Sequence, residues 1–233
     1  MTGPDRPLDP RIERGLRAQL DVLRARETAG DGRIGWKAAF RTRAAMDLVA
    51  IDRPLIGFMT ESGQLPSGAV VSLDGWDAPE FDVEIAVRLA RDIAPGADQE
   101  TVRDALGPLA AAIELNDYAP PPVDVEAVLF TNVFHRNVLL GPLDESRRSV
   151  PGFSARILLN GAEVRWLEDG GELPGELVDI VTEMSELLAA CGATLRAGDL
   201  LITGGLVAPV QVARGDHVRV QIEPLGELEV SFV

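Results

Sequence analysis

The sequence contains very little cysteine and histidine. Cys191 is the only cysteine, so no disulfide can form within the chain, and His135 and His217 are the only histidines. A structural zinc site takes about four thiolate or imidazole ligands, and these residues cannot supply one. The low cysteine content is typical of a reducing compartment, and we expect a cytoplasmic protein.

Long apolar stretches and an excess of basic charge are also missing. No run approaches the length of about 20 apolar residues that a membrane helix needs, and the first residues lack the apolar core of a secretion signal. The 233 residues include 22 Lys and Arg against 37 Asp and Glu, a formal net charge of −15. This charge repels phosphate backbones and anionic lipids, so we expect neither nucleic acid nor a membrane as a partner.

Common catalytic motifs are absent or lie in the wrong context. The sequence has no G-x-S-x-G elbow and no G-x-x-x-x-G-K-[ST] phosphate loop. Gly30, Gly32 and Gly35 match G-x-G-x-x-G, but they follow the predicted N-terminal helix, whereas the dinucleotide fingerprint follows a strand and opens a helix. These features disfavour a serine hydrolase of the α/β type, a P-loop enzyme and a Rossmann dehydrogenase.

What is present predicts a β-rich α+β fold. With 46% hydrophobic residues the chain can bury one substantial core, and we expect a single domain over 1–233, with an N-terminal helical segment over 1–32 and a β-rich core over 33–233. Asp9-Pro10 is a helix-start signal. Short alternating segments predict strands, and Asn160-Gly161 predicts a hairpin turn. Apolar residues at helical spacing mark two amphipathic helices: Ile12, Leu16, Leu20 and Leu23 in the first, and Leu177, Ile180, Val181, Met184, Leu187, Leu188 and Cys191 in the second.

The stretch "FDVEIAV" places two acids side by side. As a strand it directs Phe81, Val83 and Ile85 to one face and Asp82 and Glu84 to the other. The two acids are either the solvated face of an antiparallel strand or ligands of a hard cation such as Mg²⁺ or Mn²⁺.

A third acid lies in apolar surroundings. Glu114 occurs within "LAAAIEL", where an ionised carboxylate is costly unless it is paired or coordinated. An arginine partner or a shared cation would each satisfy it.

The order of these acids and their neighbours resembles the fumarylacetoacetate hydrolase superfamily, in particular its 2-keto-4-pentenoate hydratases and 4-oxalocrotonate decarboxylases. The resemblance rests on "GWKAA", "DVEIAV", "IELND", "AGDLLITGG" and the closing "ARGDHVRVQIEPLGELEVSF", and it extends from about Arg33 to the end of the chain. It implies a mixed β-sandwich roll with outer helices, and a homo-oligomer.

The resemblance also implies a site. Asp82, Glu84 and Glu114 take the metal-ligand positions, Lys37 the position of a catalytic lysine that also contacts substrate, and Asp117 that of a supporting second carboxylate beside Glu114. Asp82 stands where the family has glutamate, which retains the charge. The segments "KAA", "TESG" and "NVFHR" depart from the family pattern around the expected pocket.

Further candidates lie in or near these segments. Glu61 stands where the family has an aspartate, and His135 is a candidate acid or base because histidine titrates near neutrality. His135 is also compatible with a structural hydrogen bond at a strand end, and Arg136 with pairing to an acid or with binding a second carboxylate of the substrate. The candidate substrate contacts are Asn132, Arg136, Thr203 and Gly204, with Lys37.

The function implied is that of a divalent-metal-dependent hydratase, a lyase. Its substrate would be a small 2-oxo or 2-hydroxydienoic acid that is chelated by Mg²⁺ or Mn²⁺ and reacts through an enolate stabilised by the cation. A decarboxylase or C–C hydrolase of the same superfamily is the first alternative. A non-catalytic protein that binds a small acid or a protein partner is the second.

Overall fold

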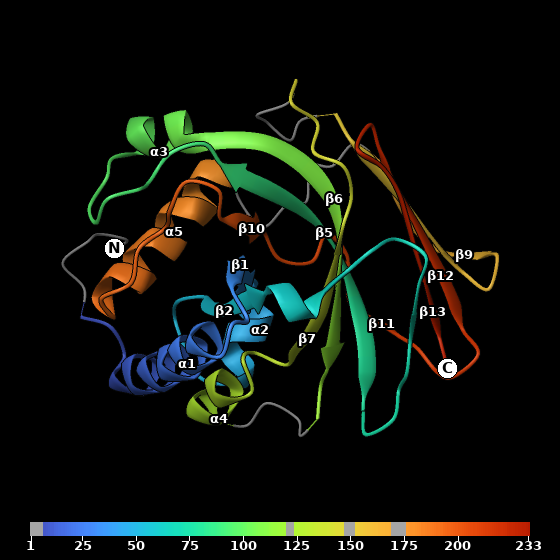
Figure 1. The fold of residues 1–233 in the computed structure, drawn as a ribbon, viewed down its shortest axis with the longest axis horizontal. Helices are drawn as coiled ribbons and strands as arrows, with labels where there is room; N and C mark the ends of the chain where they lie inside the picture. The colour runs from blue at the N-terminus through green and yellow to red at the C-terminus, as the bar shows by residue number, and fades with distance from the viewer. Residues whose placement is uncertain (1–6, 120–123, 147–151, 169–175) are drawn as a thin grey trace.

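The computed structural model describes residues 7–119, 124–146, 152–168 and 176–233, and its elements form two β-sheets with helices beside them (Figure 1). The helices are α1 (Pro10–Thr28), α2 (Arg43–Leu48), the 3₁₀ turn η1 (Glu61–Gly63), α3 (Gln99–Ala105), α4 (Val125–Phe130) and α5 (Leu177–Ala190). The strands are β1 (Arg33–Ala39), β2 (Leu55–Thr60), β3 (Gln64–Leu65), β4 (Ala69–Val71), β5 (Pro79–Leu89), β6 (Leu106–Asp117), β7 (His135–Leu140), β8 (Ser154–Leu159), β9 (Ala162–Leu167), β10 (Leu200–Ile202), β11 (Val210–Gln211), β12 (His217–Glu223) and β13 (Gly226–Phe232).

The larger sheet has the strand order β2-β1-β10-β5-β6-β7-β3, and β11 pairs with β5. Most neighbours are antiparallel, whereas β1 with β10 and β3 with β7 are parallel. The long strands β5 and β6 bend in an arc, so that the sheet curls like half of a barrel (Figure 1). This curl brings the side chains on its inner face toward one another.

The smaller sheet has the order β4-β13-β12-β8-β9 and lies on the opposite side of β5 and β6 from α5 (Figure 1). Its inward residues alternate as predicted. The hairpin between β8 and β9 turns at Asn160 and Gly161, which both have positive φ, the signature of the expected two-residue turn. The predicted β-rich α+β class is therefore confirmed.

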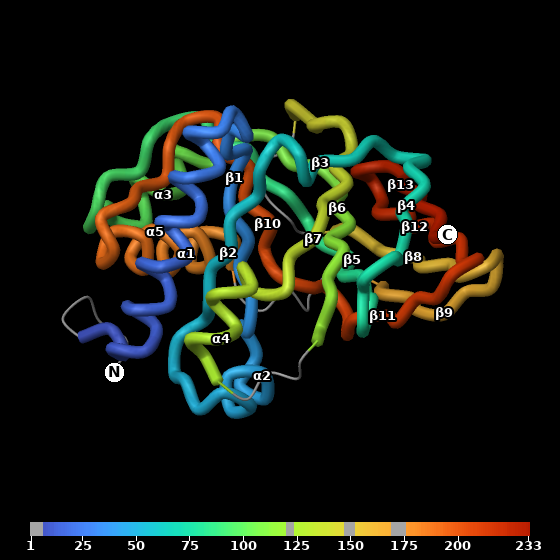
Figure 2. The backbone as a smooth tube through the Cα atoms, turned by 60° about the horizontal axis from the view of Figure 1, so that its bottom comes forward, coloured from blue at the N-terminus to red at the C-terminus, as the bar shows by residue number. Residues whose placement is uncertain are grey.

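Helix α1 begins where the sequence predicts. Asp9 is the N-cap, its carboxylate accepts a hydrogen bond from the Arg11 backbone N–H, and Pro10 occupies the first turn. The predicted apolar stripe is buried, and α1 packs on α4 and β2 (Figure 2). Within the described residues, no helix combines the length and apolar character needed to cross a membrane.

Both faces of β5 are buried, which corrects the solvated-face interpretation of "FDVEIAV". Phe81, Val83 and Ile85 join the main core with residues of α5 and the smaller sheet. On the opposite face Asp82 is 8% exposed and Glu84 is 1% exposed. The inner face of the curled sheet also holds an apolar cluster of Met59, Ala86, Ala110, Ala112, Val138, Leu200 and Ile202.

Candidate metal centre and adjoining pocket

Strand register gathers the three predicted acids. Asp82 of β5 lies directly opposite Glu114 of β6, and Glu84 follows two residues along the same face of β5. One carboxylate oxygen from each lies within 4.8 Å of the others, and all three side chains are buried. Within the described residues this is the one such group of acids, histidines or cysteines.

The surroundings of the three acids shift their pKa values in opposite directions. Burial, together with the Glu114 charge, raises the pKa of Asp82 to about 7. Burial and the two neighbouring carboxylates raise the pKa of Glu84 well above its usual range. Burial also acts on Glu114, but the Lys37 ammonium and the His135 hydrogen bond hold its pKa down to about 2. Without a cation, burial therefore favours the protonated forms of Asp82 and Glu84.

Lys37 is the only lysine of the chain, and it points into this cluster from β1. Its Nζ lies 2.6 Å from Glu114 Oε1 and donates to the Val133 carbonyl at 3.0 Å. The strands β10 and β5 separate β1 from β6 in the sheet order, so only the curl of the sheet allows this contact. With 2% exposure, Lys37 is not the solvated residue that lysine usually is.

His135 lies on the other side of Glu114. Its Nδ1 is 2.6 Å from Glu114 Oε1. Because the carboxylate is ionised, Nδ1 acts as the donor, which leaves the lone pair of the neutral ring on Nε2. Nε2 is buried and has no hydrogen-bond partner among the described residues. Burial lowers the pKa of His135 despite the Glu114 charge, so the neutral ring is the form expected at pH 7.

A left-handed turn positions both Lys37 and His135. Asn132, Val133 and Phe134 all have positive φ, between 54° and 64°, an uncommon conformation for residues other than glycine. The Asn132 side chain accepts from the Phe58 N–H and donates to the Phe58 carbonyl. These bonds tie the turn to β2, so the Asn132 amide is committed to the backbone.

The segment after β10 supports Glu84. The Gly204 N–H donates to Glu84 Oε2 at 2.8 Å, and Gly204 has a φ of 96°, which favours glycine. The Thr203 hydroxyl donates to the Ile85 carbonyl at 3.2 Å. This predicted turn therefore lies at the cluster.

Asn116 links two members of the cluster. Its Nδ2 donates to Asp82 Oδ2 at 2.9 Å, and its Oδ1 accepts from Lys37 Nζ at 3.4 Å. Asp117, expected to orient Glu114, instead accepts hydrogen bonds from the Asp77 and Ala78 N–H groups and from Arg136. Adjacent strand residues point to opposite faces, so Asn116 is directed toward the acids and Asp117 away from them.

Glu61 is not brought to the cluster. It is exposed in η1, and its carboxylate lies against Gly32. Arg136 is half-exposed, pairs with Asp117 and stacks over Trp76. Neither residue contacts the three acids through a hydrogen bond in the described part of the chain.

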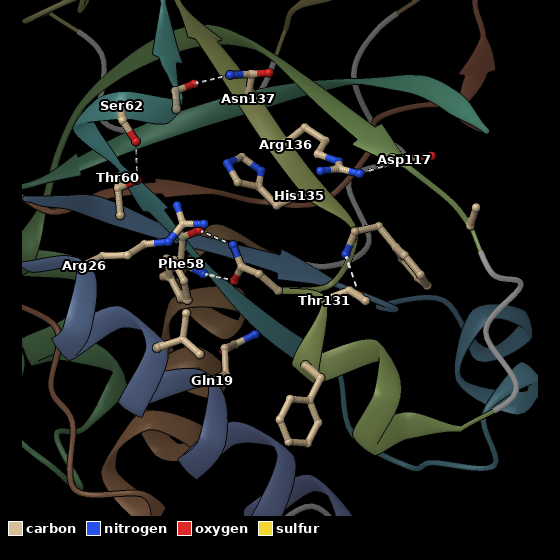
Figure 3. Close-up of a pocket in the computed structure, with 16 residues that line it drawn as sticks. Gln19, Arg26, Phe58, Thr60, Ser62, Asp117, Thr131, His135, Arg136 and Asn137 are labelled. Carbon is tan, nitrogen blue, oxygen red and sulfur yellow. Dashed lines mark hydrogen bonds and ion pairs between the residues drawn. The ribbon is translucent and has the colours of Figure 1, made fainter. Parts of the chain in front are cut away.

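A pocket of about 400 Å³ opens beside His135 (Figure 3). Its walls come from α1, the end of β2, η1, the end of α4 and the start of β7. Helix α1 contributes Gln19 and Arg26 to the pocket. The sequence analysis did not predict this contribution, because polar residues of an amphipathic helix are expected to face solvent.

The acids fit a hard divalent cation. Three carboxylates and one ammonium have a formal charge of −2 when all are ionised, and carboxylate oxygens are the ligands that Mg²⁺ and Mn²⁺ prefer. Burial and the neighbouring carboxylates raise the pKa values of Asp82 and Glu84, and a bound cation would favour their ionised forms.

We expect Mg²⁺ to stabilise the protein more at about pH 8 than at about pH 5.5. The folded-state pKa of Asp82 is about 7, above its unfolded value, so the metal-free protein loses stability as pH rises toward 7. The depressed pKa of Glu114 affects stability only at more acidic pH. Thermal unfolding with and without Mg²⁺ at both pH values measures the effect.

Asp82→Asn provides the control, because this variant removes the titrating group. The stability of the metal-free variant should change less with pH than that of the wild type. An equal Mg²⁺-induced shift in Tm at both pH values in the wild type would contradict the coupling of protons to the cation.

The fold and the site together define the class of the protein. It is a β-rich protein of two sheets, and the larger, curled sheet holds a buried cluster of acids suited to a metal ion. The model of the fumarylacetoacetate (FAA) hydrolase C-terminal family matches residues 35–233, so the chain belongs to that family. The resemblance deduced from the sequence motifs is confirmed.

Two relatives and one solved structure illustrate the similarity. The chain is 27% identical to 4-oxalocrotonate decarboxylase of Pseudomonas putida over 219 residues, which cover 92% of this chain and 83% of the relative. It is 26% identical to 2-hydroxyhexa-2,4-dienoate hydratase of Comamonas testosteroni over 231 residues, covering 95% and 86%. The structure of 4-oxalocrotonate decarboxylase from Pseudomonas putida G7, complexed with magnesium and adipate, superposes with a TM-score of 0.87 at 24% identity, covering 95% and 86%. This likeness confirms the predicted FAA hydrolase-like fold.

Proposed function

We propose that the protein is a divalent-metal-dependent hydratase, a lyase that adds water to a 2-hydroxydienoic acid or its 2-oxo tautomer. The observation that carries the proposal is the buried Asp82, Glu84 and Glu114 cluster with Lys37 Nζ 2.6 Å from Glu114. The names of the relatives, which are hydratases and decarboxylases, support the same chemistry.

In this proposal Asp82, Glu84 and Glu114 hold Mg²⁺ or Mn²⁺. A bound cation would supply Lewis-acid activation of the 2-oxo acid. Asn116 and the Gly204 N–H keep the ligand carboxylates oriented through their hydrogen bonds to Asp82 and Glu84.

Lys37 carries the proton that ketonisation requires. Its ammonium pairs with the Glu114 carboxylate and donates to the Val133 carbonyl and to Asn116 Oδ1. These three contacts fix Nζ next to the acids. Lys37 is the only lysine of the chain, and apart from two histidines all other basic side chains are arginines. Lysine can release a proton, whereas arginine stays charged, so a lysine at this position fits a role in proton transfer.

His135 favours hydration over decarboxylation. His135 lines the pocket, and its buried Nε2 carries a lone pair with no partner among the described residues. A water molecule can donate to this nitrogen, while Glu114 holds Nδ1–H and thereby the orientation of the ring. A decarboxylase releases carbon dioxide and needs no such acceptor for an added water.

The remaining predicted site residues take supporting roles. The turn at Thr203 and Gly204 holds Glu84 in place and has no role as a substrate contact in the proposal, because its N–H and hydroxyl are donated to Glu84 and to the Ile85 carbonyl. Asn132 fixes the left-handed turn whose Val133 carbonyl accepts a hydrogen bond from Lys37 and which leads into His135. Glu61 has no role in the proposal, because its side chain is exposed at Gly32.

Decarboxylation is the second candidate, supported by the 27% identity to a decarboxylase, and C–C bond hydrolysis is a further superfamily activity. A protein that only binds a small acid is disfavoured, because a binder has no need of the buried Lys37 beside the cation ligands.

A substrate panel tests the proposal. The chelator-stripped protein is supplied with Mg²⁺ and offered 2-hydroxypenta-2,4-dienoate, 2-oxohex-3-enedioate and an acylpyruvate. We expect hydration of the dienoate, lost on addition of a chelator. Release of carbon dioxide from the enedioate without hydration would assign a decarboxylase, cleavage of the acylpyruvate alone would assign a hydrolase, and no turnover of any compound would overturn the enzyme proposal.

A further inference from the structure

The pocket beside His135 is cationic in a strongly acidic protein. The chain has a formal net charge of −15, yet the charged residues that line the pocket are Arg26, Arg136 and Asp117. Asp117 is satisfied by two backbone N–H groups and by the Arg136 guanidinium at 2.7 Å. Arg26 is therefore the charge that the lining leaves uncompensated.

Arg26 extends into the pocket from the last turn of α1 (Figure 3). Its guanidinium lies over the Phe58 ring, 5.6 Å from the centroid, which restricts where the side chain can go. The nearest acid is Asp31, at 3.7 Å. The Asp31 carboxylate accepts hydrogen bonds from the Ser62 N–H and hydroxyl, at 2.9 and 2.8 Å. The long ion pair leaves Arg26 donors available to a ligand.

The pocket adjoins the metal centre through His135. One ring nitrogen of His135 contacts Glu114, and the ring itself forms part of the pocket wall. Arg26 and His135 extend into the same pocket (Figure 3). A 2-oxo acid held at the acids can thus direct its far end past His135 toward Arg26.

The rest of the wall suits a short chain ending in a polar group. Val22, Phe58, Phe130 and Phe134 provide apolar surface, while hydroxyl and amide groups of Thr60, Ser62 and Asn137 lie around Arg26 and His135 (Figure 3). Guanidinium groups bind carboxylates through charge-assisted hydrogen bonds.

We propose that Arg26 is a specificity-determining residue that binds a second carboxylate, at the end of the substrate remote from its 2-oxo acid group. The inference rests on the proposed function and makes dicarboxylic 2-oxo or 2-hydroxydienoic acids its preferred substrates, with monocarboxylic ones bound more weakly. It assigns selectivity to α1, which precedes the residues 35–233 that the family model matches.

Matched pairs of unreactive 2-oxo acids test this assignment. Calorimetry on the Mg²⁺-loaded protein compares 2-oxohexanedioate with 2-oxohexanoate, and 2-oxoheptanedioate with 2-oxoheptanoate; each pair differs in the second carboxylate alone. Because Arg26 is half-exposed, we expect a preference of about fivefold to tenfold for the diacid in at least one pair.

Two variants make the test specific. Arg26→Gln keeps the aliphatic stem over Phe58 and removes the charge, so it should abolish the preference while leaving the affinity for the monoacid within about threefold. Arg24→Gln is the matched control, because Arg24 is an exposed arginine on the same helix that pairs with Asp21 and is not part of the pocket lining. This control should retain the wild-type preference.

The outcomes separate this inference from the proposed function. Equal binding of the two acids of both pairs by the wild type, or a preference that survives in Arg26→Gln, would overturn the role of Arg26 and leave the metal-dependent function standing. Failure of all four acids to bind in the presence of Mg²⁺ would overturn the proposed function and the role of Arg26 with it.

Discussion

Replacement of Lys37 by methionine is expected to lower kcat by about 10²-fold to 10⁴-fold, the range over which positioned acid–base groups act. Methionine retains the length and apolar stem of the side chain but cannot carry a proton. The Mg²⁺ affinity should stay within a few-fold of the wild-type value, because the three proposed ligands Asp82, Glu84 and Glu114 are unchanged. Steady-state kinetics on the dienoate and a calorimetric Mg²⁺ titration provide the two measurements.

A loss of folding must be separated from a loss of chemistry. Removing one partner of a buried ion pair costs about 3–5 kcal/mol when the other charge is left uncompensated, so the metal-free variant should unfold at a lower temperature. Saturating Mg²⁺ should restore part of that stability. A Lys37→Met protein with normal turnover would remove Lys37 from the mechanism, whatever its stability.

The variant Glu84→Gln is expected to weaken Mg²⁺ binding by about 100-fold or more, because an amide replaces a charged ligand of a hard cation. The metal-free variant should remain folded. Burial and the neighbouring carboxylates raise the pKa of Glu84 well above its usual range, so the metal-free site favours an uncharged side chain at this position, and the glutamine oxygen can accept the Gly204 N–H in its place.

Glu80→Gln is the matched control for this prediction. Glu80 lies on the same strand as Glu84, but it is only partly buried and receives a hydrogen bond from Gln211. The Mg²⁺ affinity of the Glu80→Gln variant should equal that of the wild type. If Glu84→Gln binds Mg²⁺ as tightly as Glu80→Gln does, Glu84 is not a ligand.

Strand alternation predicts that Asp82 and Glu84 share a face of β5, because that rule is local. The family resemblance placed Glu114 with them as a candidate ligand, and its place opposite Asp82 follows from the pairing of β5 with β6. The burial of that face could not be predicted: an alternating strand usually has one solvated face, whereas here the curled sheet encloses its own inner surface.

The positions of Lys37 and His135 depend on longer-range geometry. Lys37 reaches Glu114 across the curl of the larger sheet, and His135 reaches it through a left-handed turn of three residues without glycine. Neither feature has a local sequence signal, so Lys37 became a candidate only through family resemblance. Resemblance also proposed Glu61, which the structure places on the exposed η1 turn instead.

Arg26 illustrates the same limit on a helix. The start of α1 and its buried residues follow from the capping signal and the helical spacing. Which exposed residue of that helix borders a pocket depends on the packing of α1 against α4 and β2, and periodicity does not contain that information.

The decisive measurement is an anomalous diffraction map from crystals of the chelator-stripped protein soaked in Mn²⁺. We expect one strong peak coordinated by carboxylate oxygens of Asp82, Glu84 and Glu114, absent from crystals of Glu84→Gln. An active protein whose crystals show no manganese between these three residues would contradict the metal centre, and the hydratase proposal built on it would fall.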